Sequence, residues 1–357
     1  MKPIVVIPAA GKSSRFTGQS PKWMRTHPDG NLMIQKSLNT FIDKDFEIYL
    51  ITTLEIEEKF LITEKLKIAL PKVNIILLEN STKSSVETLL LGLEKIGTII
   101  NIDTPLFVKD VDNLVDFEWN DFDINTSSSI GLNVKKNIVN NISNKSFIVI
   151  NENGLIIDFV EKEIVSNIIS VGTHFFKSAL EALKTAQLLL TNNVDQSYEL
   201  YTSHIIAYNI YSGIDYKMIS ATKYEDFGTQ IEWNKVRDNY KTFFVDFDGT
   251  LVENRGRYTN PNWFDRNDVP LLKNLETLKK LQDLGSQIII TTARCSSEKI
   301  YIKDFLQDNG IIVHDVICDL NHSERVIVND FFDTNPYPTA SAINVPRNGD
   351  ISNFIKI

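Results

Sequence analysis

The feature that most constrains the fold is an alternation of short apolar runs with segments whose apolar residues recur at a helical period. The short runs predict strands and the periodic segments predict helices. Such alternation is typical of βα units on a largely parallel sheet. In the first part of the chain the expected strands are residues 4–7, 47–51 and 73–77, and the expected helices lie near 33–41, 54–66 and 86–95.

A hairpin is predicted further along the first part of the chain. The stretch SFIVINENGLIIDFVEK, residues 146–162, holds two strand-like runs around Asn-Glu-Asn-Gly. An Asn-Gly turn between apolar runs is a strong local signal for antiparallel pairing. We therefore expect an α/β domain with a mixed sheet, not a purely parallel one.

The chain is long enough for two domains. Its 357 residues exceed the size at which one core usually stops growing. A polar segment, NKVRDNY, follows Trp233, and a new apolar run begins at Thr242, so we expect domains at 1–238 and 239–357. In the second domain the expected strands are 243–246, 287–291, 325–329 and 340–345, and the expected helices are 271–284 and 297–309.

The composition excludes some classes of molecule as binding partners of the protein. The net charge of -9 argues against a nucleic-acid partner, because such binding depends on clustered Lys and Arg. Cys295 and Cys318 have no metal-ligand spacing and fit a reducing compartment. The first apolar run is too short for a signal peptide, and no run approaches the roughly 18 apolar residues of a membrane span. We expect a soluble cytoplasmic protein without a membrane partner; its oligomeric state stays open.

The first candidate site follows the first apolar run, in PAAGKSSRF. A buried strand ends there in small residues, which let backbone N–H groups approach phosphates or a base closely. It is not a P-loop, because Val6 stands where that motif has its first Gly. Arg15 and Lys22 add two cations within one short loop of the strand.

This pattern, A-A-G-x-x-x-R followed by P-K, resembles the signature of sugar-phosphate nucleotidyltransferases with a GT-A-like fold. The resemblance implies that Arg15 stabilises the departing pyrophosphate and that Lys22 contacts the transferred phosphorus. Ser13 departs from the family, which usually has a second Gly there, but it is still small. The implied nucleotide-binding residues of the loop are Ala9, Ala10, Gly11 and Ser13.

Further segments match the same family in order, over roughly residues 3 to 233. FVKDVDN resembles its metal-binding strand end, with Asp110 and Asp112 as candidates and Asp112 the better match. EDFGTQIEW resembles its D-x-G-T segment, which makes Asp226 the second carboxylate for Mg²⁺. Two carboxylates suit a hard cation that also binds phosphate oxygens.

Two other matches concern the substrates. FVEKEIVSNIISVGTHFF resembles the segment that binds the sugar, and SSVETLLLGL resembles the helix start that contacts the base. An isolated Asp-x-Asp or Glu-Lys pair more often lies on a solvated surface. The prediction therefore depends on several matches that occur in the order found in the family. The implied substrate-binding residues are Glu161, Lys162 and Gly172, and the implied base-contacting residues are Ser85 and Glu87.

The reaction that this resemblance implies is an attack by a phosphate oxygen of the acceptor on the α-phosphorus of a nucleoside triphosphate. Pyrophosphate leaves, and Mg²⁺, Lys22 and Arg15 supply positioning and charge neutralisation. No residue pattern fixes the base. CTP is favoured because fused cytidylyltransferases for polyol or sugar phosphates resemble this arrangement, and UTP or dTTP stays open.

The second candidate site is FFVDFDGT, residues 243–250. Asp246 can attack a phosphorus to form an aspartyl phosphate, and Asp248 can protonate the leaving oxygen. D-x-D-G-T after an apolar run resembles the first motif of haloacid-dehalogenase-like (HAD) phosphatases. By that resemblance Thr292, or Thr291 one register away, holds the phosphoryl group. Mg²⁺ is then expected on Asp246, Asp330 and the carbonyl of Asp248, with Asp333 nearby.

The third HAD motif, usually Lys, has no clear match. Arg325 is the nearest cation and Lys303 is another. The segments between the motifs are short, which predicts a minimal cap. The tail NPYPTASAIN resembles the ending of HAD proteins from surface-polysaccharide gene sets.

Together these motifs predict a bifunctional enzyme. It would make a nucleotide-activated sugar or polyol, with a phosphatase domain acting on a related phosphate ester, for capsule or lipopolysaccharide synthesis. The alternative is a nucleotidyltransferase whose degenerate HAD domain serves scaffolding or regulation. A phosphatase that processes nucleic-acid ends is a third hypothesis, which the acidic composition disfavours.

Overall fold

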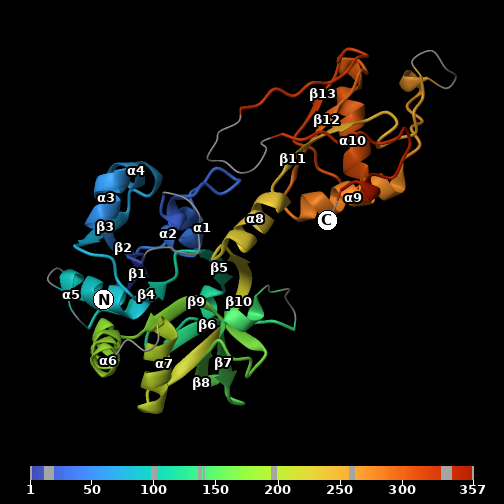
Figure 1. The fold of residues 1–357 in the computed structure, drawn as a ribbon. Coiled ribbons are helices and arrows are strands. Elements are labelled where there is room, and N and C mark those ends of the chain that lie inside the picture. The colour runs from blue at the N-terminus through green and yellow to red at the C-terminus, as the bar shows by residue number, and fades with distance from the viewer. Residues whose placement is uncertain are drawn as a thin grey trace. The chain divides into compact units, whose positions relative to one another are not determined.

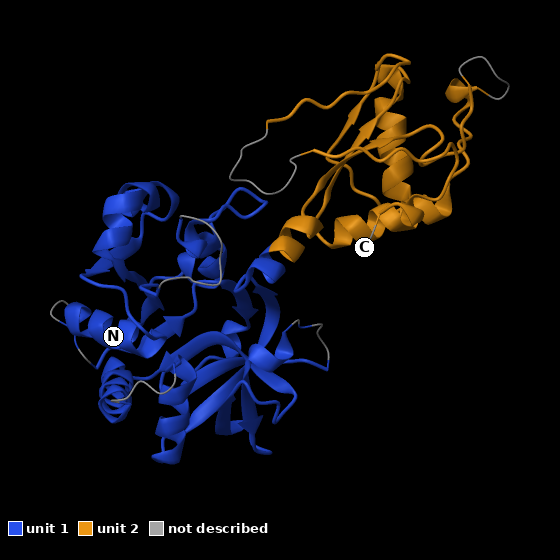
Figure 2. Cartoon of the chain, in the orientation of Figure 1, with its two compact units in different colours: residues 1–233 blue, residues 234–357 orange. Residues whose placement is uncertain are grey.

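The computed structural model describes residues 2–11, 20–97, 101, 103–135, 139, 141–193, 199–256, 262–330 and 340–355. Within it the chain forms two compact units, unit 1 at residues 1–233 and unit 2 at residues 234–357 (Figure 2). The division falls inside helix α8 (Gln230–Asn239), whose last residues include the boundary placed at 238/239 from the sequence.

Unit 1 is built on one large mixed sheet (Figure 1). Its hydrogen-bonded order is β3-β2-β1-β4-β9-β6-β10-β8-β7, and β5 pairs with β10. The strands are β1 (Ile4–Pro8), β2 (Glu47–Thr53), β3 (Val73–Leu78), β4 (Leu106–Lys109), β5 (Asn113–Phe117), β6 (Ser127–Asn133), β7 (Ser146–Ile150), β8 (Leu155–Glu161), β9 (Ile168–Phe176) and β10 (Tyr216–Asp226).

The sheet changes character along its width. Strands β3, β2, β1 and β4 run parallel, as expected of βα units, while β9 runs antiparallel to both β4 and β6. Strands β7 and β8 pair antiparallel, with Ser146 opposite Glu161. The predicted strands at the start of the chain, the hairpin and the mixed sheet are therefore confirmed.

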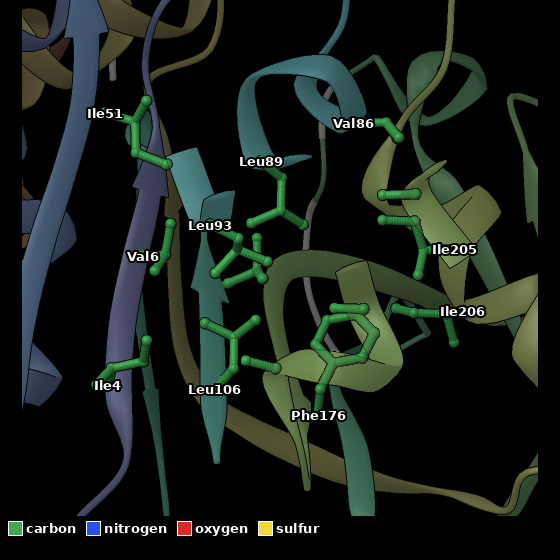
Figure 3. Close-up of a cluster of buried hydrophobic side chains, with 14 of the residues drawn as sticks. Ile4, Val6, Ile51, Val86, Leu89, Leu93, Leu106, Phe176, Ile205 and Ile206 are labelled. Carbon is green, nitrogen blue, oxygen red and sulfur yellow. The ribbon is translucent and has the colours of Figure 1, made fainter. Parts of the chain in front are cut away.

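Helices cover both faces of the sheet, and β1 is therefore buried on both sides. Ile4 and Val6 belong to one core and Val5 and Ile7 to the other, as the alternation of a strand requires. Figure 3 shows the first core, where α5 (Ser85–Ile96) and α7 (Thr202–Tyr211) pack toward β1 and β4. Also on that face is α6 (Ala179–Asn192); the other core is covered by α1 (Met33–Ser37), α2 (Asn39–Ile42) and α4 (Ile62–Ala69).

Two helices expected as single elements are each divided. Residues 33–41 form α1 and α2, and residues 54–66 form α3 (Leu54–Phe60) and the start of α4. Leu61, with φ 51°, lies in the left-handed region and ends α3, and the Glu57 carboxylate then accepts hydrogen bonds from the backbone N–H and hydroxyl of Thr63. The apolar period continues across the break, so the sequence pattern did not indicate that the helix divides. No described helix in either unit is both long and apolar enough to cross a membrane.

Unit 2 has a parallel sheet of three strands, β11 (Thr242–Asp246), β12 (Gln287–Thr291) and β13 (Asp315–Ile317), in that order. Helices α9 (Leu272–Asp283) and α10 (Lys299–Asp308) bury their apolar faces against it. The first two strands and both helices match the expectations, whereas β13 was not predicted. Three residues are too few to show an apolar alternation.

The strands predicted at 325–329 and 340–345 are wrong, because neither segment forms a strand in the structure. The side chains of Val326 and Val328 are 73% and 91% exposed, and Ile343 is 50% exposed. A β-branched run favours a strand only where it finds a hydrogen-bonded partner and a core to cover. Val345 packs against the core of unit 2, but no strand among the described residues pairs with either segment.

Candidate functional site

Unit 1 holds a cavity of about 850 Å³ that gathers most residues predicted for the first site. It opens where β1 and β4 end, next to the start of α5 and the end of β10. This position fits the rule that ligands bind beyond the carboxyl ends of parallel strands, and the volume suits a small-molecule ligand. The predicted residues that line it are Ala9, Gly11, Lys22, Ser85, Asp110, Asp112, Glu161, Lys162, Gly172 and Asp226.

Two predicted residues of the first site lie outside the cavity lining, and two others are not among the described residues. Ala10 is buried outside the cavity lining, with its carbonyl accepting from the Thr82 N–H at 3.2 Å. Glu87 also lies outside the lining, and its carboxylate accepts from the backbone N–H of Lys83 at 2.6 Å. Arg15 and Ser13 fall outside the described residues.

The carboxylates of Asp112 and Asp226 lie close together. Strand β5 pairs antiparallel with β10, which sets Asp226 opposite Asn113, and the Phe227 N–H donates to the Asp112 carbonyl at 2.8 Å. A Cβ at Gly228 would lie 3.0 Å from Asp226 Oδ1 and 3.3 Å from Asp112 Oδ2. Both carboxylates therefore border the same point, and a side chain at residue 228 would crowd them.

Each of these carboxylates forms an ion pair with its own lysine, Asp112 with Lys22 and Asp226 with Lys145. All four side chains are between 16 and 18% exposed, so their charges are largely removed from water. Burial disfavours the Asp112 carboxylate, but the charges of Lys22, Lys109 and Lys145 outweigh it and lower the pKa of Asp112 to about 2. Asp112 is therefore ionised at neutral pH.

Asp110 lies against Gly172, across β4 and β9. Its N–H donates to the Gly172 carbonyl at 2.8 Å, and a Cβ at Gly172 would lie 2.1 Å from Asp110 Oδ2. Gly172 also has φ +65°, a region that favours glycine. Burial, then the charge of Asp112, raises the pKa of Asp110 to about 6.

A fully buried lysine, Lys109, holds the turn that carries both aspartates. Its ammonium donates to the carbonyls of Asp110 at 2.8 Å and Asn113 at 3.1 Å, and to the side-chain oxygen of Asn113. Burial lowers the pKa of Lys109 to about 8. Nearby, burial lowers the pKa of His174 to about 3, so its ring is neutral beside Ser129 Oγ at 2.9 Å.

Glu161 and Lys162 end the β7–β8 hairpin and face the cavity. Glu161 Oε2 accepts from the hydroxyls of Ser146 at 2.5 Å and Ser203 at 2.7 Å. The Lys162 ammonium donates to the Tyr201 hydroxyl at 2.6 Å and lies 4.4 Å from the centre of that ring. These contacts fix the charged groups of both side chains at the cavity wall.

The chemistry of Asp112 and Asp226 suits a divalent cation. Their carboxylate oxygens are hard ligands, they border one point, and both line the cavity. Within the described parts of the chain no group of three or more His, Cys, Asp or Glu is arranged to hold a metal ion. A cation at this pair would therefore complete its shell with ligand and water oxygens, as Mg²⁺ usually does.

In unit 2, Asp246 ends β11 and forms an ion pair with Arg325, 3.0 Å from its Nη1. Burial raises the pKa of Asp246, although the charge of Arg325 opposes the shift. Arg325, which was predicted from the sequence as a candidate for the third motif, is thus a cation beside Asp246. Lys303 instead pairs with Asp315, at 3.2 Å.

Asp248 is bound by a buried arginine that the sequence analysis missed. Arg294, which is 0% exposed, donates to Asp248 from Nη2 at 2.6 Å and to Asp268 from Nη2 and Nη1, both at 2.8 Å. The Thr292 hydroxyl also donates to Asp248, at 3.2 Å. Arg294 stands two residues after the predicted Thr292, but nothing in TTARC indicates that its side chain turns inward.

The expected metal-binding set of unit 2 is not assembled in the structure. Asp330 is exposed at the end of the segment 325–329, which forms no strand. Asp246, Asp248 and Asp330 do not form a cluster among the described residues. The missing strand explains the difference, because it was to carry Asp330 to the end of β11. Thr291 is buried at the end of β12, and Asp333 lies outside the described residues.

Comparisons of sequence identify no relative. No family model matches the chain, and no curated protein matches it. A prediction of function from the sequence therefore depends on the motifs of this chain.

Solved structures do match. A nucleoside-diphosphate-sugar pyrophosphorylase from Vibrio cholerae RC9 matches with TM-score 0.55 and 22% identity, over 65% of this chain and 99% of its own. A CTP:phosphocholine cytidylyltransferase from Streptococcus pneumoniae matches with TM-score 0.51 and 18% identity, over 67% and 99%. An inositol-1-phosphate CTP transferase from T. maritima matches with TM-score 0.50 and 12% identity, over 66% and 96%.

The share of this chain that these structures cover is close to that of residues 1–233 in the 357 residues. At these identities the likeness concerns the fold. The chain therefore contains the α/β mixed-sheet fold found in these nucleotidyltransferases.

Proposed function

We propose that unit 1 transfers a nucleotidyl group from a nucleoside triphosphate to a phosphorylated sugar or polyol and releases pyrophosphate. The observation that carries this proposal is the pair of carboxylate–lysine contacts, Asp112 with Lys22 and Asp226 with Lys145, at one wall of a cavity of about 850 Å³. The fold shared with nucleotidyltransferases supports it. The cytoplasm, where nucleoside triphosphates are available, is the proposed location.

The proposed reaction needs charge and orientation more than proton transfer. A phosphate oxygen of the acceptor forms a bond to the α-phosphorus, and the bond from that phosphorus to the β-phosphate oxygen breaks, with pyrophosphate taking the electron pair. Lys22 neutralises the charge that develops on the phosphates, and Arg15 is proposed to assist it. A phosphate nucleophile is already ionised at neutral pH, so no general base is required.

Asp112 and Asp226 are the residues proposed to hold Mg²⁺, and Asp110 lies on the turn between β4 and β5 that also carries Asp112. When bound, the ion would neutralise phosphate charge and hold the triphosphate in place. Backbone groups at Ala9 and Gly11 are proposed to approach the triphosphate, because they lie at the cavity wall directly after β1.

CTP is the proposed co-substrate, with UTP or dTTP as alternatives. Two of the structures with this fold are named for CTP, one with phosphocholine and one with inositol 1-phosphate. Ser85, at the start of α5, is the described residue proposed to contact the base. Glu161 is proposed to accept hydrogen bonds from acceptor hydroxyls.

We propose in addition that unit 2 is a phosphatase, because Asp246 ends a parallel strand beside a cation, Arg325, at 3.0 Å. An Asp246 oxygen forms a bond to phosphorus as the ester bond breaks, and the leaving oxygen takes a proton from Asp248. Water then attacks the phosphorus, which frees Asp246 and releases phosphate. Its substrate would be a related phosphate ester, and the joint product would be a nucleotide-activated sugar or polyol for a surface polysaccharide.

Two observations favour the alternative for unit 2, a degenerate domain with a scaffolding or regulatory role. Arg294 donates to both oxygens of Asp248, so the side chain expected to act on the leaving oxygen is already held by another residue. The residues expected to hold Mg²⁺ in unit 2 do not fit a metal site in this structure, since Asp330 is not clustered with Asp246 and Asp248. We therefore derive no step of unit 2 through a metal.

A matched pair of assays on the full chain tests both proposals. Pyrophosphate release is measured with each of CTP, UTP, dTTP, GTP and ATP and with sugar phosphates, polyol phosphates and phosphocholine, and phosphate release is measured with the same esters. Lys22→Ala should abolish only pyrophosphate release, and Asp246→Asn only phosphate release, so each variant is the control for the other. Absence of pyrophosphate with every pair would refute the proposal for unit 1. Absence of phosphate release alone would favour the degenerate domain.

A further inference from the structure

We propose that Lys145 binds the phosphate group of the acceptor, and that it thereby selects phosphomonoesters over the corresponding free alcohols. This inference rests on the proposed function of unit 1 and assigns a role there to a residue that the sequence motifs do not include. It divides the two lysines that pair with the carboxylates between the two substrates. Lys22 faces the nucleotide and Lys145 faces the acceptor.

Lys145 reaches the cavity from the hairpin side. It lies between the short 3₁₀ turn Ile142–Asn144 and β7, and its side chain is 17% exposed. The ammonium pairs with the Asp226 carboxylate and donates to the Tyr224 hydroxyl at 3.2 Å. Its charge therefore lies at the wall that the two carboxylates share.

The backbone connects Lys145 to the predicted acceptor-binding residues. Its carbonyl accepts from the Lys162 N–H at 3.1 Å, and the next residue, Ser146, pairs with Glu161 across the hairpin. The Ser146 hydroxyl also donates to the Glu161 carboxylate, at 2.5 Å. Any ligand held by Glu161 is thus within the neighbourhood of the Lys145 segment.

Lys22 comes to the same wall from a different part of the chain. It begins the 3₁₀ helix Lys22–Met24 and pairs with Asp112. On this side the cavity is lined by Ala9 and Gly11, the residues after β1 that are proposed to approach the triphosphate. The two lysines therefore approach the Asp112–Asp226 pair from the nucleotide side and from the hairpin side.

The charges explain why Lys145 should take up a phosphate. A divalent cation bound by Asp226 and Asp112 uses the carboxylate oxygens that now face the lysines. A largely buried ammonium that loses its carboxylate needs another anion, because an unpaired buried charge is costly. The phosphate dianion of an acceptor supplies that anion, whereas the hydroxyl of a free alcohol does not.

A purely structural role for Lys145 is the competing explanation. In that case the lysine would only neutralise Asp226, and its removal would alter the carboxylate pair without affecting one substrate more than the other. The two explanations differ in which Michaelis constant changes and in whether arginine restores it. Both quantities can be measured.

The kinetic test compares Lys145→Met with Lys145→Arg in the full chain. With CTP and whichever of glucose 1-phosphate, inositol 1-phosphate or phosphocholine supports pyrophosphate release, Lys145→Met should raise the KM for the acceptor about tenfold or more, the effect expected from losing a hydrogen bond to a charged group. The KM for CTP should stay within about twofold, and Lys145→Arg should recover much of the loss. Lys217→Met, an exposed lysine on β10, is the matched control. An unchanged acceptor KM, or an equal rise for both substrates, would overturn the inference.

A binding measurement separates this inference from the proposed function. Inorganic phosphate is titrated calorimetrically into the full chain with Mg²⁺ present, which requires no turnover. Binding to the wild-type protein that falls about tenfold or more in Lys145→Met supports the inference even if no tested pair yields pyrophosphate. Equal binding to both proteins contradicts it even if the nucleotidyltransferase activity is found.

Discussion

Replacing Gly172 by alanine should both destabilise unit 1 and disturb the metal-binding turn. Two costs are expected, because the backbone there has φ +65° and the new Cβ would lie 2.1 Å from Asp110 Oδ2. Rotation of the Asp110 side chain does not remove the second cost, since the Asp110 Cβ itself would be 2.9 Å away. The end of β4 must therefore move.

The size of the effect follows from these two costs. A left-handed backbone costs about 1–2 kcal/mol for a residue with a Cβ, and forcing an extra carbon into a packed site costs about 1–3 kcal/mol. Gly154→Ala isolates the first cost, because Gly154 has φ +76° in the hairpin turn and nothing within 4 Å of the added Cβ. We expect Gly172→Ala to lower the free energy of unfolding by about 3 kcal/mol and Gly154→Ala by about 1 kcal/mol.

Differential scanning calorimetry of the two variants measures this difference. For a unit of this size 1 kcal/mol corresponds to about 2–4 °C in Tm, so the Gly172→Ala transition should fall by about 10 °C and the Gly154→Ala transition by about 3 °C. Pyrophosphate release should fall only in Gly172→Ala, since only that change displaces Asp110. Equal shifts in Tm for the two variants would refute the close packing of Gly172 against Asp110.

Three further changes test other parts of the structure. Asp110 has a pKa of about 6 in the folded chain, against 3.8 for the free residue. It therefore adds stability below about pH 4, and this stability is lost as the pH rises through 6. Thermal melts should show the wild type losing stability relative to Asp110→Asn over that range. Arg294→Met leaves the buried carboxylates of Asp248 and Asp268 without their cation and should destabilise unit 2 by about 3–5 kcal/mol in urea unfolding, whereas Lys273→Met, at an 81% exposed side chain, should change little. EDTA should abolish pyrophosphate release, and excess Mg²⁺ should restore it; full activity in EDTA would contradict the proposed role of Asp112 and Asp226.

Much of unit 1 could be predicted because its signals are local. The apolar run of β1 is buried on both faces, so it has no polar interruption and is easily recognised. Asp112 lies shortly after the end of β4 and Asp226 is the last residue of β10, and strand ends at one edge of a sheet meet in space. The order of the motifs was therefore enough to predict residues that line one cavity, although they are far apart in the sequence.

The site residues that the sequence did not predict are those whose side-chain orientation depends on tertiary contacts. Lys145 and Arg294 are single basic residues in segments of ordinary composition, and only the fold turns them toward Asp226 and Asp248. The predicted strand at 325–329 failed for the opposite reason. Its apolar composition was typical of a buried strand, but no strand in the described parts of the chain pairs with it.

The charges at the cavity wall have a consequence for how fast ligands arrive. Among the described residues that line the cavity, lysines 22, 83, 145 and 162 face a larger number of acidic groups, Asp110, Asp112, Glu161, Glu199, Asp226 and Glu232, and the whole chain carries -9. A free nucleoside triphosphate is a multiply charged anion, so its approach is opposed at long range. Added salt screens such repulsion. Encounter should therefore become faster as ionic strength rises, opposite to the salt dependence of an enzyme that attracts its substrate electrostatically.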